Sequence, residues 1–455
     1  MRYKRFVGYL ICIFGFGITF WSFYPGGMSA DSVGNLTNGR TGVFYDINSP
    51  LLSYFWGALD TIVPGPGLMF VLQILIFWVA CALLWHLTYR RSFLLGVGLT
   101  TFGLLPHILS AITVVWKDIG MGVAVFLAIV LVYFANEKKS IAALILSIVF
   151  LFIGCASRLN SMVAILPIAV WSGFVLYSVL ERQRSKLTPA LVGAAYFVAI
   201  SAGAYLITYS LTDGRTTYPF QQNYLYDLAA ISTARSEVIF PDYVLQHDMF
   251  VPELVPERYN ARSVNDLLYP DIPLPGDRPI LPITGDANEV RSLREKWIDT
   301  VWENPGAYLK HRIKVFAILV GLSRSVSATQ LYLGFADNPP EYRGSENLGY
   351  RVMMKYFGAF RRPFPQTFFF RAFIWLILCA FFLYKALKNR LADDWALVAV
   401  LATSALLYTL AYFPTTPSTE FRYLFWPAIA SMIALIFGVY LWRNEKFERL
   451  KVAEG

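Results

Sequence analysis

Long runs of apolar residues, separated by short polar connections, dominate the hydrophobic pattern of this chain. A run of about 20 apolar residues is long enough to cross a bilayer as one α-helix. We expect ten crossing helices, at about residues 6–24, 68–88, 93–113, 119–135, 140–156, 160–180, 190–211, 367–386, 395–413 and 422–442. The pattern therefore predicts an all-α polytopic membrane protein, with a bundle of about 10–12 transmembrane helices if short crossings are added.

Charges beside the apolar runs predict the orientation of the chain. Arg2, Lys4 and Arg5 precede the first run, which is longer than the apolar part of a signal peptide and lacks a good cleavage site. Other Lys and Arg residues gather in alternate connections and in the C-terminal tail. By the positive-inside rule, both termini are expected to be cytoplasmic.

The expected helices divide the chain into four parts. These are an N-terminal transmembrane core at 1–211 with a first outer loop at 25–67, a periplasmic region at 212–366, C-terminal transmembrane helices at 367–442 and a cytoplasmic tail at 443–455. In the periplasmic region, 288–304 has helical periodicity with a modest apolar face. A small outer-face domain that rests on the membrane is expected there.

One apolar stretch, near 309–322, is too short to cross a bilayer alone. A single crossing at this point would also place the basic tail outside. We therefore expect an interfacial or re-entrant helix, or one of a pair of short crossings. Lys310, His311 and Arg312 are expected to anchor it at the membrane surface.

Composition agrees with a membrane protein and argues against a nucleic-acid-binding or zinc-binding protein. Hydrophobic residues make up 56% of the chain and charged residues only 15%. The net charge of +9 comes from residues that flank the apolar runs, so nucleic acid is not an expected partner. The four cysteines lie inside apolar runs and are expected to be buried thiols, and the scattered histidines lack the spacing of zinc ligands.

Charged and polar residues collect at the predicted outer ends of the spans, although such residues are costly near a membrane and often mark a functional site. The candidates are Asp31 and Asp46 in the first outer loop, Lys117 and Asp118 before the fourth span, Arg158 and Asn160 between the fifth and sixth, and Arg422 and Tyr423 after Glu420 at the last. Five separated segments thus bring acids and cations to one side of the membrane.

This set of side chains fits the needs of an enzyme that glycosylates an acceptor. A carboxylate must take a proton from the acceptor hydroxyl as it attacks the anomeric carbon. Cations must neutralise the departing phosphate or pyrophosphate. We expect Asp31 to be the base and Asp46 a helper, with Arg158 and Arg422 as phosphate clamps.

The order of these elements resembles that of the GT-C membrane glycosyltransferases, among them relatives of the protein O-mannosyltransferases and aminoarabinose transferases. Asp31 matches the acidic residue of their first outer loop. The stretch from Asp46 resembles the acidic element that follows, with Asn48-Ser49 in place of a basic residue and Pro. Lys117-Asp118 resembles the acid of the second outer loop, and Arg422-Tyr423 resembles an Arg-Tyr pair of a late helix.

The resemblance implies a GT-C-like fold, a polyprenyl-phosphate sugar donor and a periplasmic glycan, lipid or protein acceptor. Separately, the low cysteine use and the absence of an organelle address favour a bacterial inner membrane, in contact with membrane lipids. The resemblance implies no certain cofactor, leaves a divalent cation open, and gives no metal ligands. Transfer would follow a single displacement with inversion at the anomeric carbon.

Each candidate also has a purely structural alternative. Asp31 and Asp46 could cap helices, and Lys117 and Asp118 could form a local ion pair. Arg158 could extend to lipid headgroups, and Arg422 could pair with Glu420 or Asp46. A transporter or flippase is the alternative function, although it would need acids at mid-bilayer, where the predicted helices carry few. A scaffold protein would leave the outer acids and cations without a role.

Overall fold

A computed structural model describes residues 2–181, 187–269, 279–323, 325, 331–360, 368–392 and 394–454. Within these residues the chain is helical, and its only β-structure is two isolated β-bridges. The bundle contains α1 (Val7–Phe23), α4 (Gly67–Thr88), α5 (Phe93–Thr101), α6 (Pro106–Leu109), α7 (Lys117–Lys138), α8 (Ile141–Ser157), α9 (Met162–Val179), α10 (Leu187–Thr212), α18 (Ala372–Lys388), α19 (Trp395–Thr415) and α20 (Phe425–Glu454). The all-α prediction is confirmed.

Helices occupy all ten of the segments expected to cross the membrane. Seven are themselves long and apolar enough to do so, and the pair at Phe93–Leu104 and Pro106–Thr113, bent by 48°, would make an eighth. The bend follows from Pro106, since the residue before a proline is pushed out of the helical conformation. Both α8 and α18 have 17 residues, at the lower limit for one crossing. The chain is therefore a multi-pass membrane protein, and the total of ten to twelve crossings stays a prediction.

The centre of the bundle is α7. In its most apolar stretch 89% of the residues are buried, and α4, α8, α9 and α20 pack around it. A helix that is apolar on every side and enclosed by other helices forms a core, whereas the outer helices keep one face for lipid. The first turn of α7 is consequently held on all sides, which makes it a rigid support for the site.

Two short helices, α2 (Ala30–Thr41) and α3 (Pro50–Asp60), lie in the segment expected to be the first outer loop. Ser29 and Ser32 make a capping box at the start of α2, and Ser49 caps α3, in which Pro50 is the first residue. The two helices cross at glycines: a Cβ on Gly39 would lie 2.4 Å from the carbonyl oxygen of Ser53. This close crossing fixes α2, which carries Asp31, against the rest of the loop.

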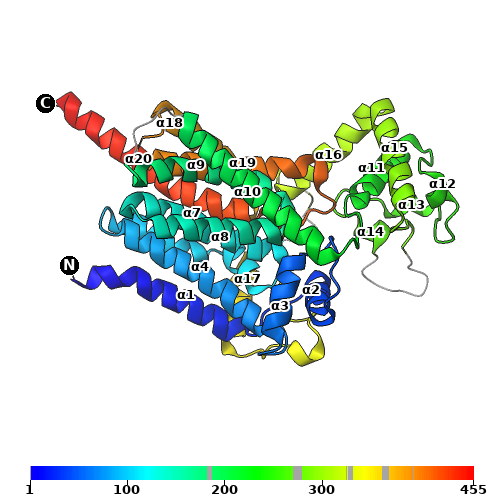
Figure 1. Ribbon diagram of the computed structural model, residues 1–455, viewed down its shortest axis with the longest axis horizontal. Coiled ribbons are helices and arrows are strands. Elements are labelled where there is room, and N and C mark those ends of the chain that lie inside the picture. Colours follow the sequence, from blue (N-terminus) through cyan, green and yellow to red (C-terminus); the bar gives the residue numbers. More distant parts are fainter. Residues whose placement is uncertain are drawn as a thin grey trace.

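A second hydrophobic core lies beyond one end of the bundle. We call the helices around it the outer unit: α11 (Gln221–Arg235), α12 (Asp242–Leu245), α13 (Leu254–Arg258), α14 (Asn265–Leu268), α15 (Ala287–Glu303) and α16 (Pro305–Leu319). Figure 1 shows this unit at the end of the bundle opposite to both termini, the end where α2 and α3 also lie. The helix predicted at 288–304 is confirmed as α15.

The residues expected to anchor a surface helix behave differently in the structure. A helix is present, α16, but the prediction that His311 and Arg312 anchor it at the membrane surface is wrong. Both side chains are buried, Arg312 completely, where they meet the carboxylate of Asp227 on α11. A local run of basic residues cannot reveal this, because the partner acid lies 85 positions away along the chain.

Candidate functional site

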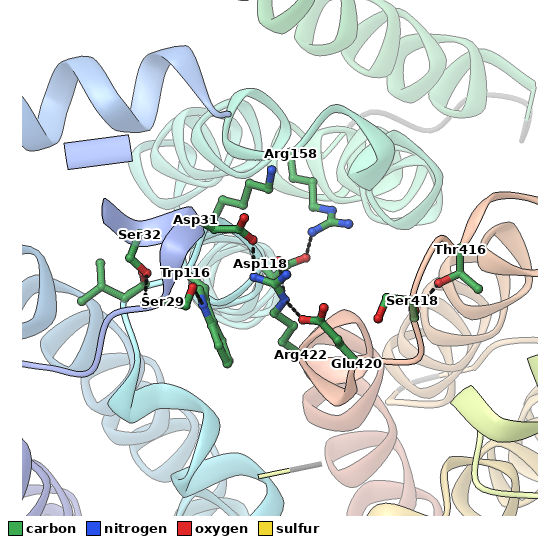
Figure 2. Close-up of polar contacts among 12 residues, drawn as sticks. Ser29, Asp31, Ser32, Trp116, Asp118, Arg158, Thr416, Ser418, Glu420 and Arg422 are labelled. Carbon is green, nitrogen blue, oxygen red and sulfur yellow. Dashed lines mark hydrogen bonds and ion pairs between the residues drawn. The ribbon is translucent and has the colours of Figure 1, made fainter. Parts of the chain in front are cut away.

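The predicted site residues meet at the end of the bundle that faces the outer unit (Figures 1 and 2). Asp31 and Asp118 lie in the first turns of α2 and α7. Arg158 follows the last residue of α8, and Arg422 lies in the short turn between α19 and α20. Four segments far apart in the sequence thus supply one cluster.

Acids and arginines alternate through this cluster (Figure 2). Nη1 of Arg422 lies 2.6 Å from Oδ2 of Asp31, and its Nε pairs with Glu420. Arg158 pairs with Asp118, whose second oxygen lies 4.0 Å from Nε of Arg422. Arg422 is therefore shared among three carboxylates, and Asp118 lies between the two arginines, which offsets the cost of holding these charges away from water.

Backbone contacts bring Asp31 beside the start of α7. Gly27 exchanges backbone hydrogen bonds of 2.9 Å with Thr113 and Val115. Oγ of Ser32 donates to the carbonyl of Val115 at 2.7 Å. The indole of Trp116 donates to Oγ of Ser29 at 2.7 Å. The N-terminus of α2 is thus fastened to the segment that leads into Lys117 and Asp118.

Aromatic rings pack against both arginines. The guanidinium of Arg158 lies 4.9 Å from the ring centre of Tyr423, and that of Arg422 lies 5.0 Å from Trp116. Tyr412 also lies near Arg158 and receives a hydrogen bond of 3.3 Å from Asn160, which itself accepts from Nε of Arg158. Flat cations stack well on such rings, so these contacts fix the direction of both arginine side chains.

Asp31 is the accessible acid of the cluster. Its side chain keeps 42% of its surface exposed, compared with 1% for Asp118 and 14% for Glu420. Burial by itself would raise the pKa of Asp31, but the charges of Arg422 and Lys117 and the bond to Arg422 outweigh it and lower the pKa to about 2. The carboxylate is therefore ionised throughout the physiological range.

The lowered pKa of Asp31 predicts how folding stability depends on pH. A depressed acid pKa contributes stability above the unfolded value near 4, and this stability is lost as the pH falls towards 2. The difference in thermal midpoint between the wild type and Asp31→Asn should thus stay constant from pH 8 to about 5 and shrink below about 4. A difference that already disappears between pH 7 and 6 would contradict the ion pair with Arg422.

A cavity of about 190 Å³ is lined in part by Arg158. Asp46, Lys117 and Asn160 share its wall. Oδ1 of Asp46 accepts two hydrogen bonds of 2.6 Å, from the backbone and the hydroxyl of Thr217, and Nζ of Lys117 donates to the carbonyl of Ile47 at 2.6 Å. Within the described residues Asp46 and Lys117 form no ion pair with the cluster, although the charge of Lys117 acts on Asp31.

The structure decides between some of the alternatives for single residues. Lys117 and Asp118 do not form the local ion pair, because Asp118 binds Arg158 and Lys117 binds a carbonyl. Arg158 does not extend to lipid headgroups, since it turns inward to Asp118. The pair between Arg422 and Glu420 is present, together with the bond to Asp31. Their roles in binding or catalysis stay predictions.

Residues that sequence reasoning missed complete the surroundings of the site. Trp116 and Tyr412 support the arginines, and Thr217 holds Asp46. Trp116 immediately precedes Lys117-Asp118, so its position in the sequence could have pointed to it. Tyr412 and Thr217 offer no such signal, because they come from α19 and from the connection after α10.

Among the described residues, no group of three or more His, Cys, Asp or Glu side chains could hold a metal ion. Cys12, Cys81, Cys155 and Cys379 are free and buried, as their apolar surroundings in the sequence predict.

No family model, no curated protein and no solved structure matches this chain. Its function has to be argued from the chemistry of the cluster and of the cavity beside it.

Proposed function

We propose that this protein is a membrane glycosyltransferase. It moves a sugar from a polyprenyl-phosphate-linked donor to a periplasmic glycan, lipid or protein acceptor, by a single displacement that inverts the anomeric carbon. The observation that carries the proposal is an ionised, partly exposed carboxylate, Asp31, set among Arg422, Arg158 and Lys117 at the end of an apolar bundle.

Asp31 would act as the general base. Arg422 engages one of its oxygens, Oδ2, and so orients the carboxylate. A pKa of about 2 makes it a weak base while this contact persists. A donor phosphate that draws Arg422 away would raise the pKa of Asp31, so that the base gains strength when the donor is bound.

Three cations are available for the phosphate of the donor. Arg158 and Arg422 already pair with acids, whereas Lys117 is held by a backbone carbonyl. Lys117 therefore brings a positive charge to the cavity without an acid bound to it in the described part of the chain. A phosphate group there would gain charge-assisted hydrogen bonds from Lys117 and Arg158 as the sugar leaves.

The surroundings favour a lipid-linked donor over a soluble one. The cluster lies where α7, α8, α19 and α20 begin or end, at one end of the apolar bundle. A polyprenyl chain could stay in the bilayer while its phosphate reaches the end of the bundle. The acceptor would approach Asp31, whose side chain is 42% exposed.

The proposal predicts that the purified protein releases polyprenyl phosphate from a suitable donor. Nanodiscs containing the protein would be offered a panel of polyprenyl-phosphate and nucleotide sugars, with lipid and glycan acceptors from bacterial envelopes. We expect release from a polyprenyl-linked donor, and only when an acceptor is present. Sugar transfer from nucleotide sugars alone, read as released nucleotide, would contradict the proposed donor class, and transfer from no donor would favour the transporter or flippase.

A further inference from the structure

The outer unit holds a buried charge cluster that the proposed reaction does not use. Asp227 on α11 and Arg312 on α16 are completely buried, and Nη2 of Arg312 lies 2.7 Å from Oδ2 of Asp227. The indole of Trp297 donates to the same oxygen at 2.9 Å, and His311 lies 3.3 Å from Oδ1. Burying such charges is costly, and a hydrophobic pair could fill the space at least as stably.

The other terminal nitrogen of Arg312, Nη1, makes a contact outside the outer unit. It donates to the backbone carbonyl of Thr416 at 2.9 Å. Thr416 begins the segment 416–422, which leads from the end of α19 to Glu420 and Arg422 (Figure 2). Asp227 thus orients a guanidinium that holds the backbone next to the site.

A second contact fixes the same segment. The amide of Val264 donates to the carbonyl of Pro417 at 2.9 Å, and that of Thr419 donates to the carbonyl of Arg262 at 2.7 Å. Ser263 and Ser418 face each other between these bonds as an antiparallel bridge. Thr416, Ser418 and Thr419 are all buried. The segment is therefore held against the outer unit by backbone hydrogen bonds and by burial.

We infer that Asp227 and Arg312 are positioning residues that set where Glu420 and Arg422 lie relative to Asp31. The purpose of the outer unit is then to hold one side of the ion-paired cluster in place. This role rests on the proposed function for its consequence in catalysis. The placement of the segment can be measured without any substrate.

The test uses the variant Asp227→Asn/Arg312→Met, which removes both charges together and so leaves no unpaired buried charge. We expect its turnover of the polyprenyl-linked donor to fall on the order of 10- to 100-fold, since a displacement of about 1 Å has such effects. The thermal midpoint and the elution volume in size-exclusion chromatography verify that the variant is folded.

A disulfide across the bridge separates positioning from a general loss of structure. A pair of this type has its Cα atoms about 4.5 Å apart, within disulfide range. Ser263→Cys/Ser418→Cys should cross-link rapidly under mild oxidation in the wild-type background, and more slowly without Asp227 and Arg312. In the variant, the closed disulfide should restore turnover to within about 3-fold of the wild type, and reductant should abolish the rescue.

Arg91→Met is the matched control, because it breaks ion pairs with Asp394 and Glu137 at the other end of the bundle. It should lower the thermal midpoint and change neither turnover nor the rate of cross-linking. Wild-type turnover and wild-type cross-linking in Asp227→Asn/Arg312→Met would overturn the inference, as would a disulfide that closes without rescue. If the wild type turns over no donor, the proposed function fails, and the rate of cross-linking alone decides the inference.

Discussion

Asp31→Asn is expected to reduce glycosyl transfer by about 10³-fold or more, the loss typical of removing a positioned general base. The amide keeps the shape of the side chain and can still accept a hydrogen bond from Arg422, but it cannot take the proton of the acceptor hydroxyl. Turnover would be read as polyprenyl phosphate released by purified protein in nanodiscs. Binding of the donor should change far less than turnover.

Asp60→Asn is the matched control for this variant. Asp60 also lies in the first outer loop and pairs with an arginine, Arg40, at 2.8 Å, but it is outside the cluster. Its replacement should leave turnover unchanged. Full activity in Asp31→Asn would show that Asp31 is not the base. An equally large loss in Asp46→Asn alone would move that role to the cavity beside Lys117.

Arg158→Met is expected to cause the largest loss of stability, about 3–5 kcal/mol, because it leaves the buried carboxylate of Asp118 with only the more distant Arg422, at 4.0 Å. Asp118 is only 1% exposed and lies in the first turn of α7, the central helix. The contacts of the guanidinium with Tyr423 and Tyr412 would be lost as well. Denaturation in detergent micelles, followed by circular dichroism, measures the change.

The double variant Asp118→Asn/Arg158→Met tests the reason for this loss. It removes both charges, so most of the stability should return even though the ion pair is absent. A double variant as unstable as Arg158→Met would show that the cost comes from lost packing against the tyrosines. A stable Arg158→Met would contradict the buried ion pair itself.

The sequence predicts the helices of this protein well, for a physical reason. Lipid-facing and core helices both require long apolar runs, which are local features that can be read from the chain. Pro106 shows what a local pattern hides, because the expected single span at 93–113 is bent there. The sequence pattern also predicts only a loop at 25–67, whereas the structure has the capped helices α2 and α3 there. Ser29, Ser49 and Pro50 are typical start signals for such helices.

Partners within the site could be predicted much less well. Sequence order and predicted orientation place Asp31, Asp118, Arg158 and Arg422 at one end of the bundle, and the structure brings them together. Sequence order and orientation do not show that Arg422 binds Asp31, a residue 391 positions away. Such pairs depend on how the helices pack. For the same reason, Arg312 was expected at the membrane surface, because Asp227 is near it only after folding.

The most direct measurement follows one labelled sugar through the reaction. Proteoliposomes with the purified protein would receive a polyprenyl-phosphate donor that carries the label, and both the acceptor and the lipid would be analysed by mass spectrometry. Glycosyl transfer predicts one glycosylated acceptor for each polyprenyl phosphate released, with the anomeric configuration inverted. Movement of the intact donor across the bilayer, with the label still on its lipid, would contradict the enzyme and support a flippase.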